Sequence, residues 1–554
     1  MRVYEELARC FAMEEVTTHF GLMGDGNMHF MAAMASMGET RMVAVRHEHC
    51  ALLMAVGYWS ATGLPGVCSV THGPGFTQLM TGLTTAARNN AAVVVLAGET
   101  GIGTAWSVQT VDQAPLARAC GADYLAVHSP KVLHHRIREA FYIARTKNRP
   151  VVLGIPIDLM KTECTGLPEY VPSLVHLPPS DPMPPEPSTI GALADRLMTA
   201  RAPVLVAGRG AVLAGAGEAI EQLADASGAL LGTTLLGKGI FDDHPFSIGV
   251  VGGYISEAGR DAVADTDLVI AFGAQLSRFT LDGGKLFRDA ETVQVDIAPR
   301  ALNEGLIVAD RVVRADAKLA AEALLDAVCA TPNRRTAEIR TKTLATHLRE
   351  APADSERFDP PSGFADPRAV FDALERVLPP DYHLVSGAAH QAYWHTAMRG
   401  IAGGNYHAVR AYGAIGNSLS FAAGIATAQA DGKVILSDGD GGLLMHVQEL
   451  ETLVREGIRL LVICINDGAY GAEVHKLRAD AVDAEGAIFG HTDLAALASA
   501  FGLGAATITD HAQVRGAFED FENDERAWLW DVRVSGFQQS PPMRAGLAGR
   551  GAQL

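Results

Sequence analysis

Short apolar runs separated by longer helical stretches recur along almost the whole chain. Strands of a parallel sheet read in this way because helices cover both faces of the sheet. Regular alternation of strand and helix predicts an α/β fold built from doubly wound parallel sheets. The clearest expected strands are residues 92–97, 151–155, 203–207, 268–272, 293–297, 433–436 and 460–465.

Two proline-rich stretches, residues 177–187 and 357–367, interrupt this pattern and are expected to be linkers. Three domains suit a chain of 554 residues, at about 100–200 residues per domain. The first and third blocks also share a loose internal similarity, because a helix, a buried strand and a short polar segment follow one another in both. The predicted division is a first domain, a central domain, a third domain and a tail: residues 1–175, 188–335, 365–536 and 537–554.

The composition restricts the possible partners. A formal net charge of −18 argues against a nucleic acid or an anionic membrane. Hydrophobic residues make up 48% of the chain, yet no apolar run reaches the length of about 18 residues that a membrane span needs. The seven cysteines are scattered without a CxxC pair, and no signal-peptide pattern opens the chain. We therefore expect a cytoplasmic protein with reduced thiols.

The most informative residues follow two neighbouring expected strands of the third domain. Strand 433–436 leads into the sequence SDGDGG, which contains Asp440, and strand 460–465 leads into Asn466 and Asp467. Because the carboxyl ends of parallel strands meet at one edge of a sheet, Asp440 and Asp467 are expected to lie close together.

These residues suit a diphosphate that is held together with magnesium. A hard cation takes oxygen ligands, which Asp440, Asp467 and the carbonyl group of Ala469 would supply. Glycines and a helix N-terminus bring backbone N–H groups to phosphate oxygens. The alternative is that these aspartates and glycines only cap helices and form turns. The glycines in question are Gly439, Gly441 and Gly442.

The GDG sequence around Asp440, followed by the Asn466-Asp467 pair, resembles the GDG and NN motif of thiamine diphosphate enzymes of the pyruvate decarboxylase, acetohydroxyacid synthase and benzaldehyde lyase group. The resemblance covers nearly the whole chain. It implies a pyrimidine-binding, a central and a diphosphate-binding domain, with thiamine diphosphate and Mg²⁺ as cofactors. Two positions depart from the family pattern, because Asp467 replaces the usual asparagine and Gly442 a small Ser or Ala.

A second matching segment is Arg46-His47-Glu48, at an expected strand-to-helix junction. In the family, a glutamate at this position meets the pyrimidine ring of the cofactor, so the resemblance implies that Glu48 is catalytic. Such a carboxylate favours the tautomer that takes the proton from the thiazolium carbon. The alternative is that Glu48 only interacts favourably with the helix dipole.

Further cofactor contacts follow from the resemblance. The turn at 412–416 resembles the segment that bends the cofactor, with Ile415 as the wedge between its rings and the Gly413 carbonyl as a hydrogen-bond acceptor. The alternative is that Ile415 is a core residue between glycines. Tyr470, beside the metal loop, is expected to contact the cofactor. The same holds for His390 and Gln391, which resemble a pair that touches the diphosphate.

The substrate side combines features of two subgroups. Asp25 resembles the substrate-facing aspartate of pyruvate decarboxylases, and Glu473 lies where these enzymes carry a second carboxylate. Gln109 matches the substrate-contacting glutamine of acetohydroxyacid synthases and benzaldehyde lyase. His72 replaces a small residue, and the ordinary pKa of an imidazole lies near neutral pH, which suits acid–base work. Three of these residues also have a structural explanation. Asp25 would cap a turn, Glu473 would be a solvated helix residue, and His72 would be a structural histidine.

The leading hypothesis is a non-oxidative 2-oxo acid decarboxylase, or a lyase and carboligase of 2-hydroxy ketones. An acetolactate synthase-like transferase is the alternative, and a non-catalytic cofactor-binding regulator is an alternative of another class. The resemblance also implies a homodimer or homotetramer with the cofactor at the subunit interface. FAD is not expected, because the Gly208-Arg209-Gly210 segment is an incomplete dinucleotide loop.

Overall fold

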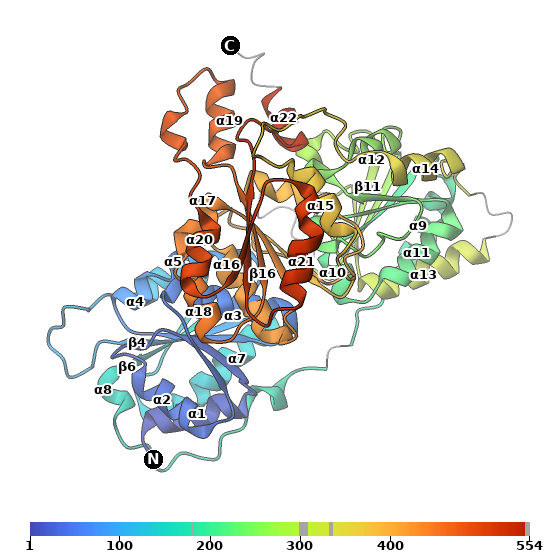
Figure 1. Ribbon diagram of the computed structural model, residues 1–554. Coiled ribbons are helices and arrows are strands. Elements are labelled where there is room, and N and C mark those ends of the chain that lie inside the picture. The colour runs from blue at the N-terminus through green and yellow to red at the C-terminus, as the bar shows by residue number, and fades with distance from the viewer. Residues whose placement is uncertain (180, 299–308, 332–335, 549–554) are drawn as a thin grey trace.

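The computed structural model describes residues 1–179, 181–298, 309–331 and 336–548. They form three six-stranded parallel sheets covered by helices, so the prediction of doubly wound α/β layers is confirmed. In Figure 1 the sheets belong to three lobes, coloured blue, green, and orange to red. The end of the predicted central domain, 332–335, and the end of the predicted tail, 549–554, lie outside the described residues.

The first sheet has the strand order β2-β1-β3-β4-β6-β5. Its strands β3, β4 and β6 are almost entirely buried and rich in valine and leucine, as sheets covered on both faces require. They span Thr18–Gly21 (β1), Arg41–Ala44 (β2), Gly66–Val70 (β3), Val93–Glu99 (β4), Asp123–Ala126 (β5) and Pro150–Pro156 (β6). The main covering helices are α1 (Val3–Met13), α2 (Met28–Met37), α3 (Glu48–Thr62), α5 (Met80–Arg88) and α7 (Leu133–Lys147).

The third sheet repeats the order of the first, β14-β13-β15-β16-β18-β17. The loose internal similarity in the sequence therefore corresponds to the same topology in both domains. The strands span His383–Ser386 (β13), Tyr406–Ala408 (β14), Val434–Gly439 (β15), Leu461–Asn466 (β16), Gly504–Ile508 (β17) and Trp528–Arg533 (β18). The main helices are α15 (Pro367–Glu375), α16 (Ser418–Gln429), α17 (Asp440–Leu443), α18 (Glu449–Arg455), α19 (Gly471–Ala479), α20 (Leu494–Phe501) and α21 (Val514–Glu522).

The central sheet has a different order, β12-β11-β10-β7-β8-β9, which is the strand order of nucleotide-binding sheets. Both linkers end on a proline that is the first residue of a helix, where a missing N–H costs nothing. The strands span Pro203–Ala207 (β7), Leu230–Thr233 (β8), Ser247–Val250 (β9), Leu268–Phe272 (β10), Glu291–Asp296 (β11) and Arg311–Arg314 (β12). The main helices are α9 (Pro187–Thr199), α11 (Gly217–Ser227), α12 (Glu257–Ala262), α13 (Ala317–Ala330) and α14 (Lys342–Glu350).

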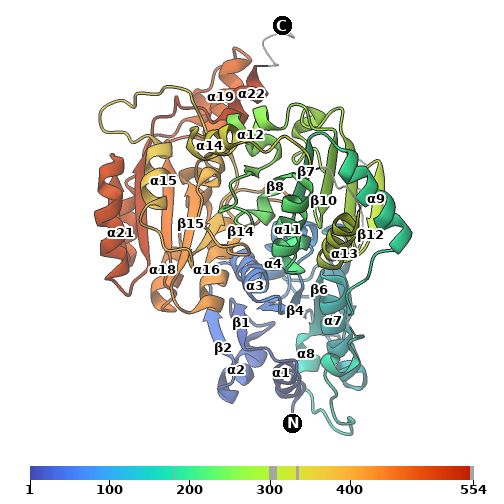
Figure 2. The same cartoon turned by 90° about the vertical axis from the view of Figure 1, so that its right-hand side faces the viewer.

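Helices α3 and α16 join the first and third domains (Figure 1; Figure 2). Two glycines allow their backbones to touch. A Cβ atom at Gly57 would lie 2.0 Å from the carbonyl oxygen of Phe421, and one at Gly424 would lie 2.0 Å from that of Met54. The helix that begins at Glu48 is therefore held directly against the domain that carries Asp440.

Substitution at this contact is expected to loosen the two domains. Gly57→Ala should destabilise the chain by about 1–3 kcal/mol, because the added methyl group meets rigid backbone. The matched control is Gly191→Ala inside α9, where nothing lies within 4 Å of the new methyl group. That change should stabilise by about 0.4–1 kcal/mol. Thermal unfolding of both variants checks the prediction, and equal midpoints would contradict it.

The predicted tail is partly helical and packed. Helix α22 (Pro541–Leu547) lies beside α19 in both views (Figure 1; Figure 2). Arg544 forms an ion pair with the buried carboxylate of Asp354, and the backbone N–H of Ser540 donates to His390 Nε2. Among the described residues, no helix combines the length and apolar character needed to cross a membrane.

Candidate active site

The two aspartates singled out by the sequence lie at the same edge of the third sheet. Asp440 is the first residue of α17, directly after β15, and Asp467 directly follows β16, the neighbouring parallel strand. Asp440 Oδ2 accepts a hydrogen bond from the N–H of Gly468 at 3.0 Å, and Asp467 Oδ1 accepts from Ala469 at 3.2 Å. The helix begins at Asp440 because extended Gly439 serves as its N-cap.

Electrostatics makes this pair a suitable cation site. Burial raises the pKa of Asp440, and the neighbouring charge of Asp467 raises it further. Burial also raises the pKa of Asp467. Two partly desolvated carboxylates that repel each other are stabilised by a hard divalent cation, which takes oxygen ligands. Hydrogen bonds around this loop go to the carbonyls of Gly468, Ala487 and Tyr470, and among the described residues none goes to the carbonyl of Ala469.

Close neighbours leave little room for a side chain at the two glycines that follow Asp440. A Cβ atom at Gly441 would lie 2.7 Å from the ring of Tyr470, and one at Gly442 would lie 3.2 Å from Asp438 Oδ1. Asp438 itself was not singled out by the sequence analysis. Burial raises its pKa to about 7, and within the described part of the chain its Oδ2 atom has no hydrogen-bond partner. The signal that was missed is the place of Asp438 in the same SDGDGG run as Asp440.

The turn expected to bend the cofactor contains two glycines with positive φ. Gly413 and Gly416 have φ of 76° and 83°, and half-buried Ile415 stands between them. A Cβ atom at Gly416 would lie 2.9 Å from the sulfur of Met445, a neighbour that no local pattern indicated. Asn417 Oδ1, at the end of the turn, accepts a hydrogen bond from His49 Nε2 at 2.9 Å, which ties the turn to α3.

His390 and Gln391 begin the 3₁₀ helix η6 (His390–Ala397), after β13. Gln391 Oε1 accepts from Ser437 Oγ at 3.4 Å, and its side chain lies next to Gly439. Burial, with a smaller effect of His475, lowers the pKa of His390 to about 3, so its imidazole is neutral at pH 7. Gln391 therefore flanks the end of β15, whereas His390 contacts His475 and the segment before α22.

The first-domain residues gather around the turn from Thr71 to Gly75. A Cβ atom at Gly75 would lie 3.1 Å from Glu48 Oε1, which places the carboxylate of Glu48 beside this turn. Gly26, next to Asp25, donates its N–H to Thr71 Oγ1 at 2.9 Å. The structure thus brings Glu48 and the Asp25 segment to one place, although they come from different elements.

The same turn carries His72 and is covered by Gln109. The backbone of Gln109 packs on Gly73, where a Cβ atom would lie 2.1 Å from the Gln109 carbonyl oxygen. His72 is buried, which lowers its pKa, while the negative charge of Asp25 opposes that shift. The charge of Asp25 thus acts on His72, which lies on the turn beside the Asp25 segment.

Removing the charge of Asp25 gives a testable shift. In Asp25→Asn the pKa of His72 should fall further, because burial remains and the carboxylate that favours the imidazolium is gone. The measurement is an NMR titration of the histidine ring protons, with His72→Gln used to assign the signal. A His72 titration that is the same in both proteins would show that the two groups do not interact.

Glu473 is not placed with these groups. It lies in the first turn of α19, is exposed, and pairs with Lys476 Nζ at 3.3 Å on the same helix. Within one chain its contacts match the plain alternative of a solvated helix residue.

The glycines of the central-domain segment have a packing role. Gly208 follows β7, and a Cβ atom there would lie 2.4 Å from the carbonyl oxygen of Gly273 after β10. Arg209 is turned away, with its guanidinium 4.4 Å from the centre of the Trp59 ring. Backbone packing therefore accounts for the glycines at the position where such sheets bind nucleotides. The expectation that FAD is not used stays a prediction.

Comparison with known proteins agrees with this geometry. Residues 1–116, 190–324 and 386–532 match the models for the N-terminal TPP binding domain, the central domain and the C-terminal TPP binding domain of thiamine pyrophosphate enzymes. The chain therefore belongs to the thiamine pyrophosphate enzyme family, whose cofactor is also called thiamine diphosphate. The residues at the edge of the third sheet fit a magnesium diphosphate. Asp440, Asp467 and the Ala469 carbonyl offer oxygen ligands for the ion, and the glycines offer backbone N–H groups for phosphate oxygens.

Several curated proteins are similar over most of their length. The acetolactate synthase large subunit of Parasynechococcus marenigrum is 29% identical over 89% of this chain and 81% of its own length. The acetolactate synthase isozyme 2 large subunit of Escherichia coli is 27% identical, with 95% and 94% covered. The probable 2-ketoarginine decarboxylase of Pseudomonas aeruginosa is 28% identical, with 90% and 88% covered.

Proposed function

We propose that the chain is a thiamine diphosphate and magnesium-dependent transferase of the acetolactate synthase type. It would join two 2-oxo acids, or a 2-oxo acid and another carbonyl compound, with loss of one carbon dioxide. The observation that carries this proposal is similarity to acetolactate synthase large subunits along 89% and 95% of the chain, which includes both halves of the site. The alternative left open by the sequence is thus better supported than its leading hypothesis.

Each half of the site has a distinct task in this proposal. When bound, thiamine diphosphate supplies a carbon nucleophile that attacks the carbonyl and accepts the electron pair left by carbon dioxide. Asp440 and Asp467 would hold the magnesium ion, with the Ala469 carbonyl as a third ligand. Glu48 would share a proton with the pyrimidine ring of the cofactor. Half-buried Gln109 offers an amide donor and acceptor that orient the acceptor carbonyl.

A second candidate is decarboxylation without transfer, in which a proton takes the place of the second carbonyl. The position of the Asp25 segment beside the turn that carries His72 favours it, because these two titratable side chains are the candidates for delivering that proton. The 2-ketoarginine decarboxylase relative adds support.

Product analysis separates the two candidates. Purified chain with thiamine diphosphate and Mg²⁺ is incubated with a panel of 2-oxo acids, and carbon dioxide, aldehyde and 2-hydroxy ketone products are measured. The proposal predicts one carbon dioxide for two carbonyl substrates consumed and a longer carbon skeleton. One carbon dioxide and one aldehyde for each 2-oxo acid would reject the transferase in favour of the decarboxylase.

We further propose a homodimer or homotetramer in which Glu48 of one subunit and Asp440 of its partner serve the same cofactor. Exposed apolar side chains on the loop that carries Gln109 support a subunit contact there, because such patches are typical of interfaces. They are Ile102, Trp106 and Val108.

Mixed subunits test this arrangement. Glu48→Gln and Asp440→Asn chains are co-expressed with different tags, and hetero-oligomers carrying both tags are purified. A site shared between subunits leaves one intact site for each doubly defective one, so activity should return to about half of wild type. The separate variants are the controls. Activity that stays at their level would mean that each cofactor is held within one chain.

A further inference from the structure

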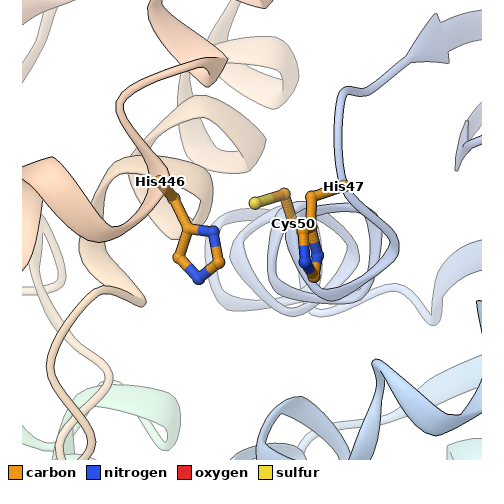
Figure 3. A group of neighbouring side chains, drawn as sticks. All are labelled: His47, Cys50 and His446. Carbon is orange, nitrogen blue, oxygen red and sulfur yellow. The ribbon is translucent and has the colours of Figure 1, made fainter.

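We propose that His47, Cys50 and His446 form a second metal site, for a zinc-type transition ion, between the first and third domains. One ligand atom from each residue lies within 4.8 Å of the others. Figure 3 shows the three side chains gathered at the start of α3, with His446 reaching over from the segment after α17. This site is separate from the carboxylates of Asp440 and Asp467 and is independent of the proposed function.

Local structure presents these side chains as ligands. His47 is the N-cap of α3, and its Nδ1 atom accepts the N–H of His49 at 3.1 Å, which orients the ring and leaves Nε2 available. Cys50 stands three residues further on, on the same side of the helix. His446 stacks on His49 with ring centroids 4.9 Å apart. Burial and the neighbouring histidines lower the pKa of His446 to about 4, so its imidazole is neutral and can bind a metal at pH 7.

The donor set selects the ion. Two imidazoles and a thiolate suit zinc and related transition metals, whereas magnesium and calcium take oxygen ligands. Binding converts the Cys50 thiol to a thiolate and releases its proton to solvent. Burial raises the pKa of Cys50, so part of the binding free energy is spent on this step. His47 and His446 are half-buried and Cys50 is buried, so an ion from solvent would enter from the side of the histidines. Three protein ligands leave the fourth position of a tetrahedral ion for water.

A metal ion at this site would join two domains. His47 and Cys50 lie at the start of α3 in the first domain, and His446 lies in the third domain. The cross-link would include the residue next to Glu48. Zinc should therefore raise the thermal unfolding midpoint of the chain, since ligands that bind only the folded state stabilise it.

Cobalt provides the direct test. Co²⁺ is added to the full chain that already holds thiamine diphosphate and Mg²⁺, and thiolate-to-cobalt absorption is recorded. We expect one equivalent to bind, to be displaced by Zn²⁺, and to give no such absorption in Cys50→Ser. Affinity should fall at least about tenfold in His446→Gln, which removes an imidazole from a half-buried position.

The matched control is Cys10→Ser. Cys10 belongs to the other buried group of possible ligands, Glu6, Cys10 and His134, and its removal should leave the absorption unchanged. Circular dichroism of each variant verifies folding. Absent absorption in the wild-type chain, or absorption that persists in both Cys50→Ser and His446→Gln, would overturn the proposal.

Discussion

Glu48→Gln is expected to lower turnover by about 10²- to 10⁴-fold, the usual contribution of a positioned acid–base group. Glutamine keeps the size of the side chain and cannot share a proton with the cofactor in the same way. Affinity for thiamine diphosphate should change much less than turnover, because Asp440, Asp467 and the glycine loop are untouched. Steady-state kinetics and a binding titration measure the two effects separately.

The control for this prediction is Glu257→Gln. Like Glu48, Glu257 is the first residue of a helix, α12, but it lies in the central domain. If Glu48 only interacted with the helix dipole, both substitutions would have the same small effect. Unchanged turnover in Glu48→Gln, with the cofactor bound, would remove Glu48 from the catalytic groups.

Asp440→Asn is expected to raise the Mg²⁺ concentration needed for cofactor binding by at least about 100-fold, since even outer partners of a metal ligand contribute 10- to 100-fold. Asp467→Asn should change it by less than about tenfold, because asparagine keeps an oxygen ligand and is the residue that the family usually carries at this position, unlike at Asp440. Quenching of tryptophan fluorescence during Mg²⁺ titration at fixed thiamine diphosphate provides the measurement.

The order of the two effects is the informative outcome. The control is Asp483→Asn, an exposed aspartate beyond α19 that should leave the titration unchanged. An Asp440→Asn chain that binds Mg²⁺ and cofactor like wild type would remove Asp440 from the metal site. Larger loss in Asp467→Asn would show that the two aspartates have exchanged roles.

The strands and the approach of Asp440 to Asp467 could be predicted, because short runs of sequence indicate where each strand lies and ends. The runs at Pro203–Ala207 and Leu268–Phe272 are strands with the predicted bounds. The meeting of Asp440 and Asp467 follows from the rule that parallel strands end at a common edge. The glycines at 413 and 416 likewise mark backbone with positive φ, which side chains disfavour.

The long-range contacts could not be predicted. The hydrogen bond between His49 and Asn417 joins residues 368 positions apart, and the contact of Gly57 with Phe421 depends on how two helices pack. Neither has a periodic or local pattern. The same limit applies to the substrate side, where the Asp25 segment lies against the turn that carries His72 and Glu473 is left in solvent.

The central claim is that this chain uses thiamine diphosphate and a divalent metal to release carbon dioxide from a 2-oxo acid. The direct measurement is carbon dioxide release from a panel of 2-oxo acids by purified chain, before and after removal of thiamine diphosphate and Mg²⁺. Carbon dioxide release should be lost on removal, should return when both are added back, and should be at least about 100-fold lower in Glu48→Gln. Release that does not depend on the cofactor, or no release from any 2-oxo acid by the loaded chain, would contradict it.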